Sequence, residues 1–163
     1  MSIIAKLEKM TSLALYANDA FKVLKAILED ERDGAAFTVV FGNSINFLNK
    51  TTLVGIPPSK EKERKWQFLS QKKVSLPMHL GEVSSFQSED KEKEQYPGGV
   101  WVLPWGYGTS GFKSSDDEAF SITMGVQAGD ISMRVAEEIA SLNNNWSRVQ
   151  NMLAAVKSMP FKG

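Results

Sequence analysis

The first part of the chain carries an apolar stripe with the period of an α-helix, and this stripe constrains the fold more than any other feature. Ser2 can cap the start of the helix, and Asp33-Gly34 can end it, because glycine accepts the positive φ that a helix C-terminus often needs. The spacing predicts one amphipathic helix from Ser2 to about Glu31. Its stripe consists of Ile3, Leu7, Met10, Ala14, Ala17, Phe21, Leu24 and Leu28.

A stripe of this kind has two interpretations. It usually packs a helix against a protein core. In a detachable helix at a chain end, it can instead lie in a membrane interface. Periodicity is compatible with both roles.

Beyond this helix the apolar period changes to two, which is typical of strands with one buried face. Phe37, Val39 and Phe41 are separated by single residues and precede a Gly-Asn-Ser turn. Pro57-Pro58 closes another candidate strand, because proline cannot donate to a β-ladder. Further strands are predicted over residues 45–48, 52–56, 66–69, 74–80, 100–103 and 120–126.

The C-terminal part returns to helical spacing from Ile131 to Val156, with Asp130 as a candidate cap and a predicted break at Asn143-Asn144-Asn145. The charge-dense stretches 59–65 and 88–95 are interpreted as solvated loops. We therefore expect an α+β fold with a β-sandwich-like core between N-terminal and C-terminal amphipathic helices. One domain, 1–163, would comprise a helix over 1–33, a β-rich core over 36–128 and a helical segment over 130–158.

Composition narrows the function classes. The 163 residues include no cysteine, so thiol catalysis and disulfides are excluded. The 19 basic and 19 acidic side chains cancel, and nucleic acid is therefore not an expected partner. No classical secretory signal precedes the first helix. The protein is expected either to be secreted without such a signal or to be cytoplasmic.

Few residues point to catalysis. His79 is the only histidine, and an exposed strand position explains it most simply. Asp116, Asp117 and Glu118 form a carboxylate cluster that could bind calcium or serve acid–base chemistry, but its spacing favours a solvated turn. We predict no catalytic residues, no metal site, no cofactor and no enzymatic activity.

A concentration of aromatic residues is the strongest candidate binding feature. Trp101, Trp105, Tyr107 and Phe112 lie in a glycine-rich stretch, residues 97–115, that is interpreted as a strand running into a flexible loop. Tryptophan and tyrosine suit ligand clefts, protein interfaces and the headgroup layer of membranes. The alternative for Trp101 is burial in the core.

Taken together, several segments resemble the actinoporin-like cytolysins, in which an amphipathic N-terminal helix precedes a β-sandwich. The tyrosines with which that family cages choline are replaced here by Ala136, Ala140 and Ser141. The matching segments are Ala20–Glu29, Phe37–Ser44, Val74–Pro77, Gly98–Leu103, Phe120–Val126 and Arg134–Ile139.

The resemblance implies a pore-forming toxin. Loop aromatics would dock on a lipid membrane, with sphingomyelin as a candidate lipid, and self-association would then build a helix-lined pore. The pore helix would present Ile3, Leu7, Met10, Phe21, Leu24 and Leu28. The alternative is a non-catalytic binding module, such as a lectin-like or immunity protein, that uses the aromatic stretch to contact a carbohydrate or a protein.

Overall fold

The computed structural model describes residues 2–30, 32–42, 47–75, 83–85, 90, 92 and 96–163. These residues form one antiparallel sheet with the strand order β2-β1-β5-β4-β3. Each strand pairs antiparallel with its neighbours. The strands are β1 (Gly34–Gly42), β2 (Phe47–Gly55), β3 (Val83–Ser85), β4 (Gly99–Val102) and β5 (Trp105–Ser110).

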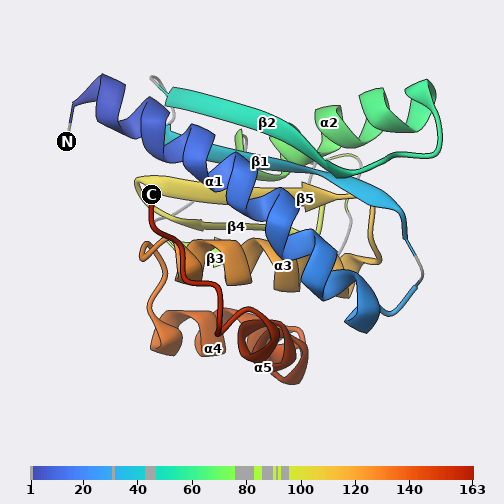
Figure 1. Ribbon diagram of the computed structural model, residues 1–163. Helices are drawn as coiled ribbons and strands as arrows, with labels where there is room; N and C mark the ends of the chain where they lie inside the picture. Colours follow the sequence, from blue (N-terminus) through green and yellow to red (C-terminus); the bar gives the residue numbers. More distant parts are fainter. Residues whose placement is uncertain are drawn as a thin grey trace.

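Helices cover both faces of the sheet (Figure 1). One face carries α1 (Ile3–Leu24) and α3 (Ser114–Gln127), and the other carries α2 (Lys60–Ser75). A 3-10 turn, η1 (Lys25–Ile27), extends α1. Below α3, α4 (Met133–Leu142) and α5 (Trp146–Ala155) form an outer layer.

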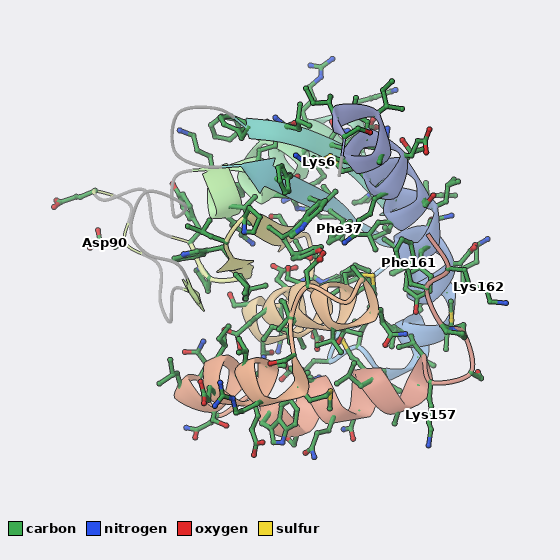
Figure 2. All side chains as sticks on the ribbon, turned by 90° about the vertical axis from the view of Figure 1, so that its left-hand side faces the viewer. Lys6, Phe37, Asp90, Lys157, Phe161 and Lys162 are labelled. Atoms are coloured by element: carbon green, nitrogen blue, oxygen red, sulfur yellow. The ribbon has the colours of Figure 1, made fainter. Side chains whose placement is uncertain are left out.

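The main core lies between the sheet and the helices α1 and α3. Phe37 on β1 is fully buried there (Figure 2), and its ring contacts Phe120 on α3 at a centroid distance of 5.8 Å. Val40 points to the opposite face of the sheet, where it belongs to a smaller cluster with Val74 and Trp101 under α2. The alternation along β1 thus buries both faces, because each face of the sheet is covered.

Two glycines allow α2 to approach the sheet closely. A Cβ at Gly108 would overlap the carbonyl oxygen of Ser70, and a Cβ at Gly99 would overlap the backbone of Lys73. Ser70 is also linked to the sheet through its hydroxyl, which lies 2.8 Å from the Thr38 hydroxyl. Glycine is therefore required on β4 and β5 for steric reasons.

The α+β class and the helices at both ends of the chain are confirmed. The Ser2 side chain accepts from the N–H of Ala5 at 3.1 Å, as expected of a cap, although the α-helix ends at Leu24 rather than near Glu31. The predicted break at Asn143–Asn145 separates α4 from α5. A β-sandwich is not confirmed, because the part of the chain that the structure describes forms one sheet covered by helices.

Several predicted strands are wrong. Residues 120–126 belong to α3, and residues 66–69 belong to α2, as do the charged residues 60–65 that were predicted as a loop. Helix α3 is buried from Asp116 to Gly125, because the sheet covers one side and α4 and α5 cover the other. A helix buried all round loses the one-sided pattern by which it is recognised.

Other strand predictions are partly confirmed. Residues 37–41 lie in β1 and residues 100–102 in β4. Residues 47–48 and 52–55, from two separate candidates, belong to one longer strand, β2, and residues 45 and 46 lie outside the described residues. Val74 and Ser75 end α2, and the rest of the candidate 74–80 lies outside the described residues, as do His79 and most of 88–95.

Candidate functional site

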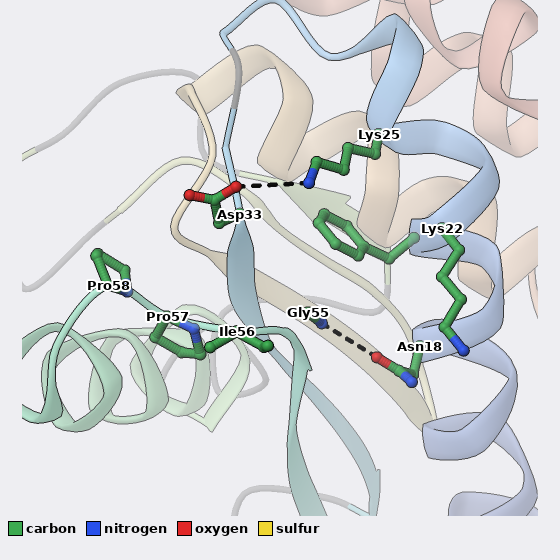
Figure 3. A pocket seen from close by; sticks show the side chains of 9 residues that line it. Asn18, Lys22, Lys25, Asp33, Gly55, Ile56, Pro57 and Pro58 are labelled. Carbon is green, nitrogen blue, oxygen red and sulfur yellow. Dashed lines mark hydrogen bonds and ion pairs between the residues drawn. The ribbon is translucent and has the colours of Figure 1, made fainter.

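An open pocket lies where the end of α1 meets the end of β2 (Figure 3). Its volume is about 590 Å³, within the range of pockets that hold small molecules. Three separate segments supply its lining, namely α1 with η1, the residue before β1, and the last residue of β2 with the three residues that follow it. The lining residues are Asn18, Phe21, Lys22, Lys25, Asp33, Gly55, Ile56, Pro57 and Pro58.

The helical side of the pocket follows from residue spacing. Asn18, Phe21, Lys22 and Lys25 are three or four positions apart, so they share one face of the helix. Phe21 is buried, and it supplies apolar surface at the base of the pocket. The two lysines therefore place ammonium groups beside an apolar wall.

The opposite side follows from strand pairing. Gly34 on β1 pairs with Gly55 on β2, which brings Asp33 beside Ile56. The N–H of Ile56 donates to the carbonyl of Asp33 at 2.9 Å. Pro57 and Pro58 then end the strand, as predicted from the sequence.

Gly55 has a φ of +65°, a backbone conformation that favours glycine. A Cβ at this position would lie 2.5 Å from the Phe21 ring and would overlap the Asp33 carbonyl. The N–H of Gly55 donates to the Asn18 side chain at 3.1 Å (Figure 3). This bond connects the two sides of the pocket.

The base of the pocket is backed by a column of aromatic rings. Phe21 stacks on Phe112 at 5.9 Å, and Phe112 meets Phe120 edge to face at 5.7 Å. Phe37 continues the column to Tyr107, with its ring 6.2 Å from the tyrosine ring. The position of Phe21 therefore depends on the packing of the main core.

The aromatic residues predicted as an exposed binding loop are buried, and that interpretation of residues 97–115 is corrected. Trp105 and Tyr107 lie on the central strand β5, and Phe112 follows it. Trp101 lies on β4 and belongs to the cluster under α2. The structure does not gather the four residues into one surface, because β4 and β5 are covered on both faces.

Trp105 and Tyr107 both lie beside charged side chains. Lys9 lies over the Trp105 ring at 4.3 Å and forms an ion pair with Asp130 at 2.8 Å. The Tyr107 hydroxyl donates to the other oxygen of Asp130. Burial, followed by the charge of Asp130, raises the pKa of Tyr107 well above its usual value, so this hydroxyl stays protonated.

The six residues of the predicted pore helix divide between core and surface. Met10, Phe21 and Leu24 are buried, and Leu28 is half-buried against the core. Ile3 and Leu7 are 63% and 43% exposed. Among the described residues, no helix combines the length and apolar character needed to cross a membrane.

The carboxylates predicted as a solvated turn are instead buried at the start of α3. Asp116 pairs with Arg148 at 2.8 Å and accepts the N–H of Glu29 at 2.7 Å. Glu118 accepts from the side-chain amides of Asn143 and Asn145. Asp117 pairs with Lys73. Each carboxylate has its own protein partners, and no group of three potential metal ligands occurs in the described part of the chain.

The pocket was not predicted from the sequence. Its parts were recognised only separately, as a predicted helix stop at Asp33, the Pro57-Pro58 strand terminator and the polar side of the first helix. Comparison of the sequence and structure with known proteins adds no relative: no family model, curated protein or solved structure matches.

Proposed function

We propose that this chain is a non-catalytic binding protein that holds a small molecule with a flat apolar body and an anionic group in the pocket between α1 and β2. The observation that carries the proposal is the combination of an apolar wall with two ammonium groups. Phe21, Ile56 and the two prolines supply the wall, and Lys22 and Lys25 supply the charge. Pockets of this composition bind through apolar burial and use a few polar groups for orientation.

The ionisable groups of the lining favour binding over catalysis. They are Lys22, Lys25 and Asp33, and all three side chains are at least half exposed to solvent. Catalytic acids and bases are usually tuned by burial. An exposed ammonium group serves instead as a charge partner for a carboxylate, sulfonate or phosphate.

Two probes of the same shape test the proposal. Naphthalene-2-carboxylate and naphthalene-2-carboxamide share a ring system and differ in charge, and calorimetric titration measures the affinity of each. We expect the carboxylate to bind more tightly than the carboxamide. Replacing both lysines, as Lys22→Gln with Lys25→Gln, should remove this preference and leave carboxamide binding unchanged.

A matched pair of variants tests the apolar wall. Ile56→Ser changes an apolar side chain of the pocket that is 80% exposed, so folding should not depend on it. Leu15→Ser changes an exposed apolar side chain of α1 that does not line the pocket. Ile56→Ser should weaken the binding of both probes, and Leu15→Ser should leave the binding of both unchanged. The proposal would be overturned if neither probe binds the wild-type protein, or if the two variants have equal effects.

Membrane binding stays a second candidate function, favoured by the exposed apolar residues at the start of α1. Ile3, Ile4 and Leu7 all present large apolar surface to solvent. Release of dye from vesicles with and without sphingomyelin tests it. Leakage that is lost in Ile3→Ser with Leu7→Ser would support this candidate, and absence of both leakage and vesicle binding would reject it.

A further inference from the structure

The pocket lining already contains an anionic group, the carboxylate of Asp33, next to one of its two lysines. The carboxylate of Asp33 lies 3.4 Å from the ammonium of Lys25, across the opening between η1 and the start of β1 (Figure 3). Both side chains are exposed, Lys25 by 51% and Asp33 by 75%. An exposed ion pair of this kind contributes little free energy, so another anion can replace it at small cost.

The backbone of Asp33 is fixed by a hydrogen bond to the residue that follows β2, whereas its side chain is exposed to solvent. Its carbonyl accepts the N–H of Ile56, which keeps the residue beside the pocket wall. Its carboxylate bonds only to Lys25 among the described residues. Rotation about the side-chain torsions can therefore withdraw the carboxylate without disturbing the β1–β2 pairing.

The other charges near the mouth are arranged differently. Lys22 lies 3.7 Å from Asp19, one turn earlier on the helix, and both are exposed. Asp30, three residues before Asp33, pairs with Arg32 at 3.2 Å and with Lys113 at 3.6 Å, and it does not line the pocket. Asp33 is thus the acidic residue of the lining itself.

We infer that Asp33 is a built-in competitor: its carboxylate occupies Lys25 in the free protein, and the anionic group of the bound molecule replaces it. This inference rests on the proposed function and adds a selectivity mechanism to it. A neutral molecule leaves the Asp33–Lys25 pair intact. An anionic molecule must displace the Asp33 carboxylate from Lys25, so Asp33 lowers the affinity for anions. Anions that also contact Lys22 gain a second charge interaction that offsets this cost, and Asp33 therefore selects for them.

A double-mutant cycle with the naphthalene probes tests the inference. Asp33→Asn keeps the size of the side chain and removes its charge, and it should tighten naphthalene-2-carboxylate binding by roughly two- to five-fold, as expected for release from an exposed ion pair. Carboxamide binding should not change. In a Lys25→Gln background, the effect of Asp33→Asn should disappear, because no ammonium group remains to compete for.

Asp30→Asn is the matched control, since it removes the same charge from the same segment outside the pocket. It should leave both affinities unchanged. If the wild-type protein binds neither probe, the proposed function fails together with this inference. If the wild type binds the carboxylate, but Asp33→Asn has no effect, acts equally without Lys25 or is matched by Asp30→Asn, only the competitor role is overturned.

Discussion

Lys73 on α2 and Asp117 on α3 form a buried ion pair of 3.2 Å, although their helices pack on opposite faces of the sheet. They meet beneath Gly98, where a Cβ would lie 2.7 Å from Asp117 and 2.9 Å from the Lys73 ammonium. Lys73 also donates to the carbonyl of Thr109 at 2.6 Å, and Asp117 accepts the N–H of Phe112 at 3.0 Å. This ion pair therefore links α2, the sheet and α3.

The pair predicts a pH-dependent stability. Burial raises the pKa of Asp117 from 3.8 to about 7, against the opposing effects of Lys73 and the Phe112 N–H, while the Asp116 charge adds to the rise. Between these two pKa values the folded protein holds a proton that the unfolded chain has released. The Asp117 contribution to the free energy of unfolding is therefore full below pH 3.8 and falls as the pH rises to about 7.

Asp117→Asn removes this titration and keeps an oxygen that can accept the Phe112 N–H. Urea unfolding at several pH values between about 4 and 8 should show a shallower loss of stability in the variant than in the wild type. The difference between the two proteins isolates Asp117 from the other titrating groups. Parallel stability curves would contradict a raised pKa at this residue.

Phe112→Ala should destabilise the protein strongly. Phe112 is 7% exposed and lies between Phe21 and Phe120, so its removal leaves a cavity in the aromatic column. Such a truncation typically costs about 3–5 kcal/mol, as measured by urea unfolding. A loss below about 0.5 kcal/mol would instead fit the exposed loop predicted from the sequence.

The conservative variant Phe112→Leu tests the link between the core and the pocket. It preserves apolar volume but removes the ring on which Phe21 stacks. We expect weaker binding of both naphthalene probes at a modest cost in stability. Unchanged affinities in a folded Phe112→Leu protein would show that Phe21 does not depend on its aromatic neighbour.

Gly108→Ala should separate α2 from the sheet. The added methyl would overlap the Ser70 carbonyl, and overpacking of this kind costs about 1–3 kcal/mol. Gly129→Ala is the control, because that glycine has a φ of +82° and no atom within 4 Å of the added Cβ. A smaller loss, of about 1 kcal/mol from backbone strain alone, is expected there. Thermal unfolding compares the two, and equal losses would argue against a tight contact between α2 and β5.

Tyr107→Phe should show how much the hydrogen bond from the Tyr107 hydroxyl to Asp130 contributes to the free energy of unfolding. The variant leaves Asp130 paired with Lys9 alone, and the lost bond to a charged group is expected to cost about 1.5–3 kcal/mol. Tyr16→Phe provides a comparison, because its hydroxyl donates to the carbonyl of Met159 and accepts from the side-chain amide of Gln127, and neither partner is charged. The loss of two neutral hydrogen bonds should cost about 1–2 kcal/mol. A smaller effect at Tyr107 than at Tyr16 would contradict the role of Asp130.

The elements that were predicted correctly are those whose pattern reflects a single local cause. α1 has one face against the core along much of its length, so its apolar residues recur with the helical period. β1 alternates, Ser2 caps α1, and Asn143–Asn145 interrupts the last helical stretch. Each of these features depends on backbone geometry within a few residues, which the sequence by itself determines.

The features that were missed depend on which surfaces cover an element. Residues 120–126 alternate apolar side chains with small ones, and only the layers on both sides of α3 explain why this is a helix with no exposed face. The aromatic residues of 97–115 were predicted to be exposed because glycines surround them. Those glycines include Gly99 and Gly108, at which α2 packs against the sheet.

The pocket shows the same limit most clearly. Asn18, Asp33 and Ile56 lie far apart in the sequence, and the antiparallel pairing of β1 with β2 under the end of α1 brings them together. Local periodicity determines how a segment folds, because the forces that set it act within a few residues. The position of the Asp33 carboxylate beside Lys25 was decided by tertiary packing, since it depends on where three separate segments end relative to one another.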